Sequence, residues 1–467
     1  MNIVQKKREE FSINIRKQKR EELFNSKRIS KNQYLPFSIS NSELSQIYSN
    51  AYYQKQCPNN VYLNETIQKI FKISELADAF NEHDCDKNYD TTSDVEIIFD
   101  NINKGYPVLD RACLQILLAF TLPNHQTCKP ILKYIPDLLK FFMETQYIEL
   151  KQTVLFIFSN LAADCYQCRD AILIYEIPQA IFQAINSTTT ELIDDLTQIL
   201  INISRTQPLM SNFNQIQMIQ LCWKLFPYLS NNESIAGILQ LIQKICKKDK
   251  NLLDLNFMND LCLKNQNSQL FLDEILSLIK IISYFDRDKY EPIEQNILNF
   301  LILKVNYNLI QEKQQQYQQR QINKVLSIFI NMIVENPKLI YNILNTNIIE
   351  LFKFDEKLQQ VNKEIFCNIY YYSFYYQIIC SLNQNQLKQF IQLFQPIILL
   401  ISLLDKNIGN TDIIIDILRI IEIIMQKNIE SIQVFREYNG EQYLAELSQH
   451  ENEDVYKLCE NLFEIIM

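Results

Sequence analysis

Apolar helical blocks that recur about every 40 residues constrain the fold of this chain more than any other feature. VLFIFSNLAAD (154–164), LTQILINISRT (196–206) and VLSIFINMIVE (325–335) each carry an Asn in their C-terminal half. Aligning the chain on that position gives seven equivalent positions, one in each repeat, called here the ladder positions. They are Ala119, Asn160, Asn202, Lys244, Tyr284, Asn331 and Tyr371. Their spacings are 41, 42, 42, 40, 47 and 40 residues, close to the period of armadillo and HEAT repeats. The sequence therefore predicts an all-α solenoid in which each repeat covers the apolar face of its neighbours.

Three regions are expected along the chain. Residues 1–31 form a basic head, residues 32–60 are polar and poorly periodic and are interpreted as a linker, and residues 61–467 carry the repeats. The long interval of 47 residues contains a Gln-rich insertion at 307–321, which is predicted to be a long loop or an extended polar helix.

Composition excludes several classes of function. The 467 residues include only four glycines, and loops that cradle phosphates need glycine for positive φ or close backbone approach. We therefore expect no nucleotide-binding enzyme and, without clustered histidines, no enzyme at all. The longest apolar run, PIILLISLL at 396–404, is too short to span a bilayer. No apolar stretch of a secretory signal follows the first charges, so cytosol or nucleus is expected.

The twelve cysteines are scattered, apart from the CYQC pair Cys165 and Cys168. Such a pair is compatible with half a zinc site or a redox pair. There is no second CxxC, and only His83, His125 and His450 are present to complete a site. We interpret these cysteines as reduced, packing thiols near a helix start, and we expect neither a bound metal nor a cofactor.

The Asn residues at the ladder positions also indicate a binding surface. In a right-handed solenoid one helix of each repeat lines the concave groove, so equivalent positions form a ladder. An Asn side chain both donates to and accepts from a peptide backbone, so a ladder of Asn can hold an extended chain with little regard to its sequence. The alternative is that Asn is simply abundant throughout this chain.

Three segments resemble the importin alpha family, the armadillo adaptors of nuclear import. KKREEFSINIRKQKREELFNSKR (6–28) is similar to the importin-beta-binding segment, NLAADCYQCRDAIL (160–173) to a groove signature, and EYNGEQYLAELSQHENEDVYKLCENLFE (437–464) to the last repeat. The resemblance implies a right-handed armadillo superhelix of about 8 to 10 repeats with an N-terminal basic helix. It also implies shuttling between cytoplasm and nucleus, and an export factor bound at the last repeat.

The resemblance implies a groove for basic nuclear-localisation signals centred on Asn160 and Asp164. The two lie four residues apart on one helix face, so an amide and a carboxylate converge on one ligand. The family's Trp, one turn before each groove Asn, is replaced by Gln115, Phe156, Gln198, Gln240, Lys280, Ser327 and Cys367. The loss of cation-π slots weakens the predicted site. The predicted groove residues are Phe156, Asn160, Asp164, Gln198, Asn202, Asn331 and Glu364.

The basic head carries a net charge of +6, against −15 for the rest of the chain. A helix of mixed charge and apolar anchors suits an acidic tunnel, which the resemblance places in importin beta. Four Glu in the head argue against nucleic-acid or membrane-surface binding. The predicted importin-beta-binding residues are Lys6, Lys7, Arg8, Arg16, Lys17, Lys19, Arg20, Lys27 and Arg28.

Two functions follow from these observations. The first is an import adaptor that binds basic signal cargo in its groove and importin beta through its head. The second is an armadillo scaffold that keeps importin beta but binds one dedicated partner in place of general basic signals.

Overall fold

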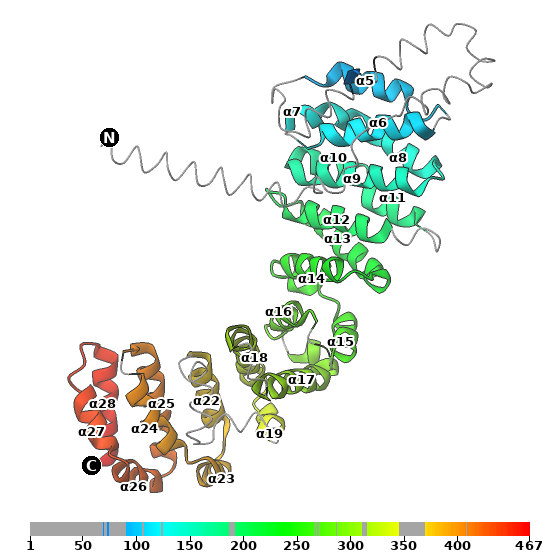
Figure 1. Cartoon of the computed structure of the whole chain (residues 1–467). Coiled ribbons are helices and arrows are strands. Elements are labelled where there is room, and N and C mark those ends of the chain that lie inside the picture. The colour runs from blue at the N-terminus through cyan, green and yellow to red at the C-terminus, as the bar shows by residue number, and fades with distance from the viewer. Residues whose placement is uncertain are drawn as a thin grey trace, which may run out of the picture. The chain divides into compact units, whose positions relative to one another are not determined.

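The structure is a computed structural model that describes most of the repeat region. It describes residues 69, 72–73, 90–104, 107–122, 125–185, 192–266, 268, 270–285, 287–310, 315–344, 369–407 and 409–467. Within these residues every regular element is a helix (Figure 1), so the all-α prediction is confirmed for this part of the chain. The basic head, the linker and Glu364 lie outside the described residues.

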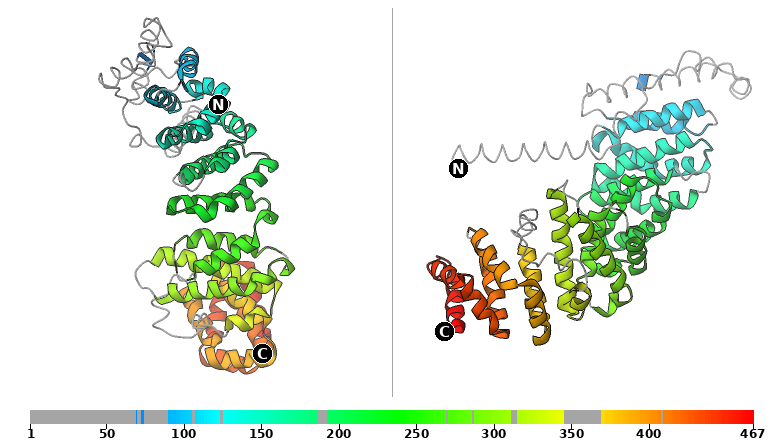
Figure 2. Two further views of the ribbon diagram at one scale, coloured as in Figure 1. Left: turned by 90° about the vertical axis from the view of Figure 1, so that its right-hand side faces the viewer. Right: turned by 60° about the horizontal axis from the view of Figure 1, so that its bottom comes forward.

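The first of two compact units comprises Met1–Ile245. Its helices are α5 (Thr92–Asn101), α6 (Pro107–Phe120), α7 (His125–Cys128), η2 (Lys129–Tyr134), α8 (Ile135–Glu144), α9 (Ile148–Asp164), α10 (Tyr166–Ile174), α11 (Ile177–Ala184), α12 (Leu192–Arg205), α13 (Asn212–Leu225), η3 (Phe226–Tyr228) and α14 (Asn232–Cys246), which ends one residue past the boundary. Helix α9 packs between α6 and α12, and Figure 2 shows the helices of this unit in successive layers.

The second unit comprises Cys246–Met467. Its helices are η4 (Lys250–Leu252), α15 (Leu255–Lys264), α16 (Leu272–Ile282), α17 (Arg287–Ile310), α18 (Gln315–Glu335), α19 (Leu339–Leu344), α22 (Ile369–Ser381), α23 (Gln384–Phe394), α24 (Pro396–Lys406), α25 (Thr411–Lys427), α26 (Glu430–Glu437), α27 (Gly440–Leu447) and α28 (Glu453–Ile466). Helices α16, α18, α22, α25 and α28 pack each against the next.

Each unit is a stack of helical repeats, as the 40-residue period predicts. Several repeats consist of two short helices and one longer helix, as in α10, α11 and α12 and again in α26, α27 and α28. The longer helices pack side by side and bury their apolar faces; Leu155, Phe158 and Leu200 are fully buried. Of the Gln-rich insertion, residues 307–310 end α17 and residues 315–321 begin α18, so these parts are helical.

The Asn- and Asp-rich breaks in the sequence supply helix caps. Asp254 accepts hydrogen bonds from the backbone N–H of Asn256 and Phe257, at 2.8 and 3.1 Å. Asn383 begins α23 with a capping box that it shares with Gln386. Such side chains satisfy backbone donors that have no partner within the helix. The breaks therefore define where these helices start.

Helix C-termini are closed from the following repeat by lysine side chains. Lys304 Nζ donates to the carbonyls of Asn265 and Gln266, both at 2.9 Å, beyond the end of α15. Lys427 Nζ donates to the Ile379 carbonyl at 3.0 Å, at the end of α22. A cation at a helix C-terminus satisfies orphan carbonyls and interacts favourably with the helix dipole. This chain closes helix ends with side chains where other proteins use glycine.

Among the described residues, no single helix combines the length and apolar character needed to cross a bilayer. Helices α23 and α24 meet this requirement only when taken together, and they are bent by 63° where they meet.

Glycine is required where α27 passes over Phe435. A Cβ added at Gly440 lies 2.4 Å from Phe435 Cζ and 2.5 Å from Cδ1 and Cδ2, and this ring is fully buried. We expect Gly440→Ala to destabilise the protein by about 1–3 kcal/mol through overpacking. Gly409→Ala is the matched control, because nothing lies within 4 Å of its Cβ. Urea unfolding followed by circular dichroism measures both; equal midpoints for the two variants contradict this packing.

Candidate functional site

The ladder Asn residues of the first unit form hydrogen bonds between repeats. Asn160 Nδ2, in α9, donates to Thr121 Oγ1 at 2.9 Å, just beyond α6. Asn202 Nδ2, in α12, donates to both the carbonyl and the Oγ of Ser159 at 3.0 Å. Both Asn residues are 0% exposed. Each side-chain amide therefore faces the preceding repeat.

The same relation holds at two further ladder positions. Lys244, in α14, donates to the Ser204 carbonyl at the end of α12. In the second unit Asn331 Nδ2 donates to Ser283 Oγ at 2.9 Å. At these four positions the ladder therefore joins a long helix to a hydroxyl or carbonyl about one repeat earlier in the sequence.

The residues one turn before the ladder positions lie beside them but do not form aromatic slots for Lys or Arg side chains. Phe156 is half-buried, and Gln198 Nε2 donates to Asn202 Oδ1 at 3.2 Å. In the second unit Lys280 Nζ lies 6.0 Å from the centre of the Tyr370 ring. Asn202 thus has its nitrogen and its oxygen both engaged by the protein.

Asp164, the acid predicted to hold a lysine of the signal, is buried at the C-terminal end of α9, with 7% of the residue exposed. Its Oδ2 lies 2.9 Å from His125 Nδ1 and accepts from the thiols of Cys128 at 3.4 Å and Cys168 at 3.6 Å. The structure places this carboxylate in a cluster of histidine and cysteine side chains.

Two turns, one repeat apart, build that cluster. His125 and Cys128 begin and end α7, whereas Cys165 is the N-cap of α10 and accepts from the Cys168 backbone N–H at 3.4 Å. Cys165 Sγ lies 3.3 Å from His125 Nδ1 and 3.4 Å from Cys168 Sγ. Cys168 Sγ lies 3.6 Å from His125 Nδ1. Cys165 and Cys168 lie at a helix start, as the sequence predicted, but the prediction omitted their partners.

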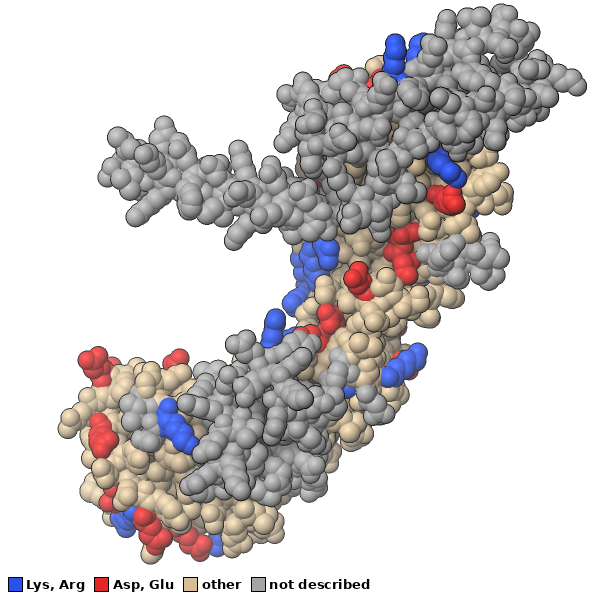
Figure 3. All heavy atoms as spheres, in the orientation of Figure 1, with Lys and Arg blue, Asp and Glu red and all other residues tan. Residues whose placement is uncertain are grey.

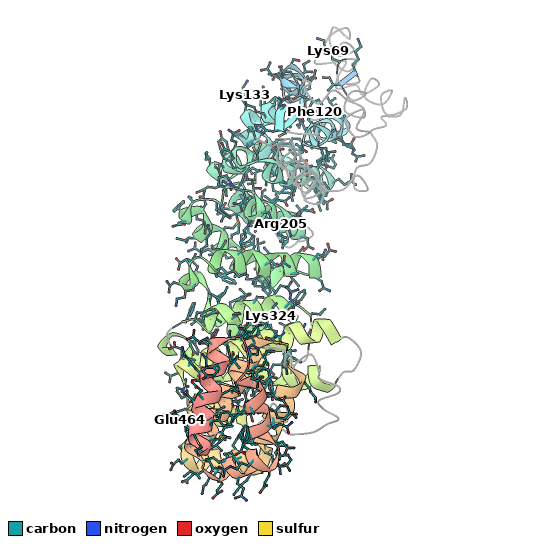
Figure 4. The ribbon with its side chains drawn as sticks, turned by 90° about the vertical axis from the view of Figure 1, so that its left-hand side faces the viewer. Lys69, Phe120, Lys133, Arg205, Lys324 and Glu464 are labelled. Carbon is teal, nitrogen blue, oxygen red and sulfur yellow. The ribbon has the colours of Figure 1, made fainter. Side chains whose placement is uncertain are left out.

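Hydrogen bonds fix the α7 turn in place. Thr127 Oγ1 donates to the Phe120 carbonyl at 2.8 Å, and Thr91 Oγ1 donates to the Thr127 carbonyl at 2.7 Å. Thr91 and Thr127 are fully buried. Figure 4 labels Phe120, at the C-terminal end of α6. The turn that carries His125 is thereby attached both to α6 and to the start of α5.

Burial and mutual contact shift the ionisation of the cluster. Burial raises the pKa of the Cys165 thiol to about 12. The hydrogen bond with Cys128, followed by burial, raises the pKa of Cys168. Burial lowers the pKa of His125, but the hydrogen bond to Asp164 and the neighbouring Cys168 outweigh it, so the pKa is raised. Both thiols are protonated at neutral pH in this arrangement.

Basic side chains gather at the C-terminal ends of α12 and α14, on the face shown in Figure 3. Arg205 ends α12 and is exposed, while Lys244 is half-buried. Like charges within a Debye length of about 10 Å repel. The exposed Arg205 therefore adds positive charge at this end of the repeats.

Sequence reasoning missed His125 and Cys128 as partners of the CYQC pair. HQTC at 125–128 precedes CYQC at 165–168 by 40 residues. That interval equals the repeat period, so the two turns recur at equivalent places in neighbouring repeats. A search for His and Cys in register with the period would have found the cluster.

No protein-family model matches this sequence, and no curated protein matches it significantly. Among solved structures, the chain is similar to an engineered protein, with TM-score 0.53 and 13% identity over 80% of this chain and 88% of that one. A chain from a structure in which Kap95p binding induces the switch loops of RanGDP to adopt the GTP-bound conformation gives TM-score 0.48 and 12% identity over 91% of this chain and 54% of that one. Importin beta, crystallised in a polyethylene glycol condition, gives TM-score 0.38 and 9% identity over 85% of this chain and 52% of that one. The fold thus defines a helical-repeat protein.

The ladder bonds make a prediction about stability. Asn202→Ala leaves the buried Ser159 acceptors without this donor, so we expect a loss of about 1–3 kcal/mol. Asn232→Ala, at an exposed position in α14, is the control and is expected to stay within about 0.5 kcal/mol. Thermal and urea unfolding check both. An Asn202→Ala variant as stable as the control would show that the Asn202–Ser159 hydrogen bonds contribute nothing to the stability of the fold.

Proposed function

We propose that this chain is an armadillo-type adaptor of nuclear transport that joins importin beta through its basic head and one dedicated partner through its repeats. The similarity of residues 6–28 and 437–464 to importin alpha supports the class. Repeats of three helices, such as α10–α12 and α26–α28, are what armadillo units use. Shuttling between cytoplasm and nucleus, and an export factor at the last repeat, belong to the same proposal.

The burial of the ladder is the observation that favours a dedicated partner over general basic signals. A peptide backbone needs accessible amide donors and acceptors, and Asn160 and Asn202 are 0% exposed. Their nitrogens donate within the protein, and the Asp164 carboxylate lies against His125. Binding a signal through these residues therefore requires breaking buried hydrogen bonds, at about 1–3 kcal/mol for each group left unsatisfied.

The surface charge supports the same choice. Arg205 is exposed at the end of α12, and the predicted aromatic slots hold Gln198 and Gln240. A dedicated partner that contacts exposed apolar and polar side chains needs neither the Asn ladder nor the slots. Exposed apolar side chains are available, among them Tyr147, Tyr166, Phe213 and Tyr228 in the first unit.

The head is the part expected to bind importin beta. Reversing Arg16, Lys17, Lys19 and Arg20 to Glu is expected to weaken importin beta binding more than about 100-fold, because close charge pairs across interfaces are worth about 1.5–7 kcal/mol each. The matched control reverses the exposed Lys129, Lys133, Lys140 and Lys457 and is expected to keep binding. Isothermal titration or surface plasmon resonance with purified importin beta measures both. Equal affinities for the two variants would remove importin beta from the proposal.

Titration of a monopartite basic peptide separates the two readings of the groove. With residues 1–31 deleted, we expect binding weaker than about 100 μM, roughly −5.5 kcal/mol, and unchanged by Asp164→Asn. Micromolar or tighter binding that Asp164→Asn abolishes would instead establish general signal recognition through Asp164 and the ladder. Circular dichroism of both chains verifies that the helical fold is retained.

A further inference from the structure

We propose that His125, Asp164, Cys165 and Cys168 form a binding site for a zinc ion that joins two neighbouring repeats. The four ligand atoms lie within 4.8 Å of one another. This site reverses the sequence expectation that the chain binds no metal. It is independent of the proposed function, since it concerns how the repeats are held together.

The distances between the donor atoms match a tetrahedral site. Zinc bonds of about 2.3 Å to sulfur and about 2.0–2.2 Å to nitrogen or oxygen place tetrahedral donors about 3.4–3.8 Å apart. The observed separations are 3.3 Å between Cys165 Sγ and His125 Nδ1, and 3.4 Å between the two sulfurs. Cys168 Sγ lies 3.6 Å from both His125 Nδ1 and Asp164 Oδ2. The pair of His125 Nδ1 and Asp164 Oδ2, at 2.9 Å, and the two pairs that include Cys165 Sγ have to separate by a few tenths of an ångström.

The donor set has the chemistry that zinc prefers. Two thiolates and an imidazole select a borderline-soft ion over Ca²⁺ or Mg²⁺, which require oxygen ligands. The spacing of the two cysteines, C-x-x-C, is that of structural zinc sites. Cys128 donates its thiol hydrogen to Asp164 Oδ2 at 3.4 Å, and so orients the carboxylate, as groups around metal ligands commonly do.

The site is held rigidly and has a route for entry. The Thr127 and Thr91 hydrogen bonds fix the α7 turn, and the N-cap contact fixes Cys165 to α10. Cys168 is fully buried, whereas the His125 side chain is 34% exposed. A zinc ion enters past the imidazole and is then enclosed.

Four protein donors leave no open coordination position, so the ion is structural and not catalytic. It links the turn after α6 to the turn between α9 and α10, residues about 40 positions apart in the sequence. On binding, the two thiols lose their protons to solvent and become thiolates, so affinity rises with pH. Zinc thereby stabilises the pair of repeats that contains α6–α10.

Metal analysis of the full chain tests the proposal. Purified under reducing conditions and reloaded with Zn²⁺ after chelation, the protein is expected to hold about one ion per chain, as a structural zinc site does. Replacing Cys165 and Cys168 by Ser is expected to remove it, and Cys380→Ser, at an exposed cysteine outside the cluster, is expected to retain it. Cobalt(II) in place of zinc is expected to show thiolate charge-transfer bands in the wild-type chain and in Cys380→Ser, but not in the variant that lacks Cys165 and Cys168. A chain that binds no ion, or a double variant that binds one as tightly, overturns the site.

Two further measurements test the same zinc site if the double variant folds poorly. Zinc is expected to raise the melting temperature of the wild-type chain and not that of Asp164→Asn. Cys128→Ser is expected to weaken binding only about 10- to 100-fold, as a group that orients a ligand does. If Cys128→Ser loses more affinity than Asp164→Asn, the fourth position assigned to Asp164 is wrong. If mass spectrometry of the reduced, zinc-treated chain finds a bond between Cys165 and Cys168, the pair is a redox disulfide and the proposal fails.

Discussion

The hydrogen bonds from four ladder positions to the preceding repeat are the interaction on which this architecture depends. An amide placed between apolar helices costs several kcal/mol unless both its ends find partners, so Asn202 fits only where Ser159 faces it. Hydrophobic packing alone would let stacked helices slide along one another, because apolar contact is non-directional. A directional bond at one place sets the register of the repeats that it joins. The apolar faces then close around it.

This use of the ladder separates stability from recognition. In the predicted groove, Asn160 and Asp164 were expected to serve a ligand, whereas the structure commits one to Thr121 and the other to the histidine and cysteine cluster. A side chain with all its hydrogen-bonding capacity used inside the fold binds a ligand only at the expense of the fold. Under the proposed function, recognition therefore falls to surfaces that tolerate change, namely the exposed helix faces and the basic head.

Much of the fold could be predicted from the sequence, because the repeat period and the helix breaks are local signals. The apolar spacing around Leu155 and Phe158 specifies a helix, and the Asn and Asp at the breaks cap the next one. The direction of the Asn side chains could not be predicted, because the periodicity of one helix does not say which neighbour covers which face. The partnership of Cys165 with His125 was missed for the same reason: it requires the packing of one repeat on another, which no local pattern contains.

The lysine caps of Lys304 and Lys427 have a consequence for how the chain assembles. Each closes the end of a helix that lies earlier in the sequence, and the ladder Asn residues also reach backward. Other polar contacts run forward, from Thr91 to the Thr127 carbonyl and from Arg169 to the Thr206 carbonyl. In either direction the bond forms only once both repeats have docked. During synthesis from the N-terminus, the carbonyls of Asn265, Gln266 and Ile379 therefore stay without their lysine partners until the repeat that carries the lysine emerges. Arg436, in α26, closes the end of α28 in a similar way, because it donates to the Ile466 carbonyl at 2.6 Å.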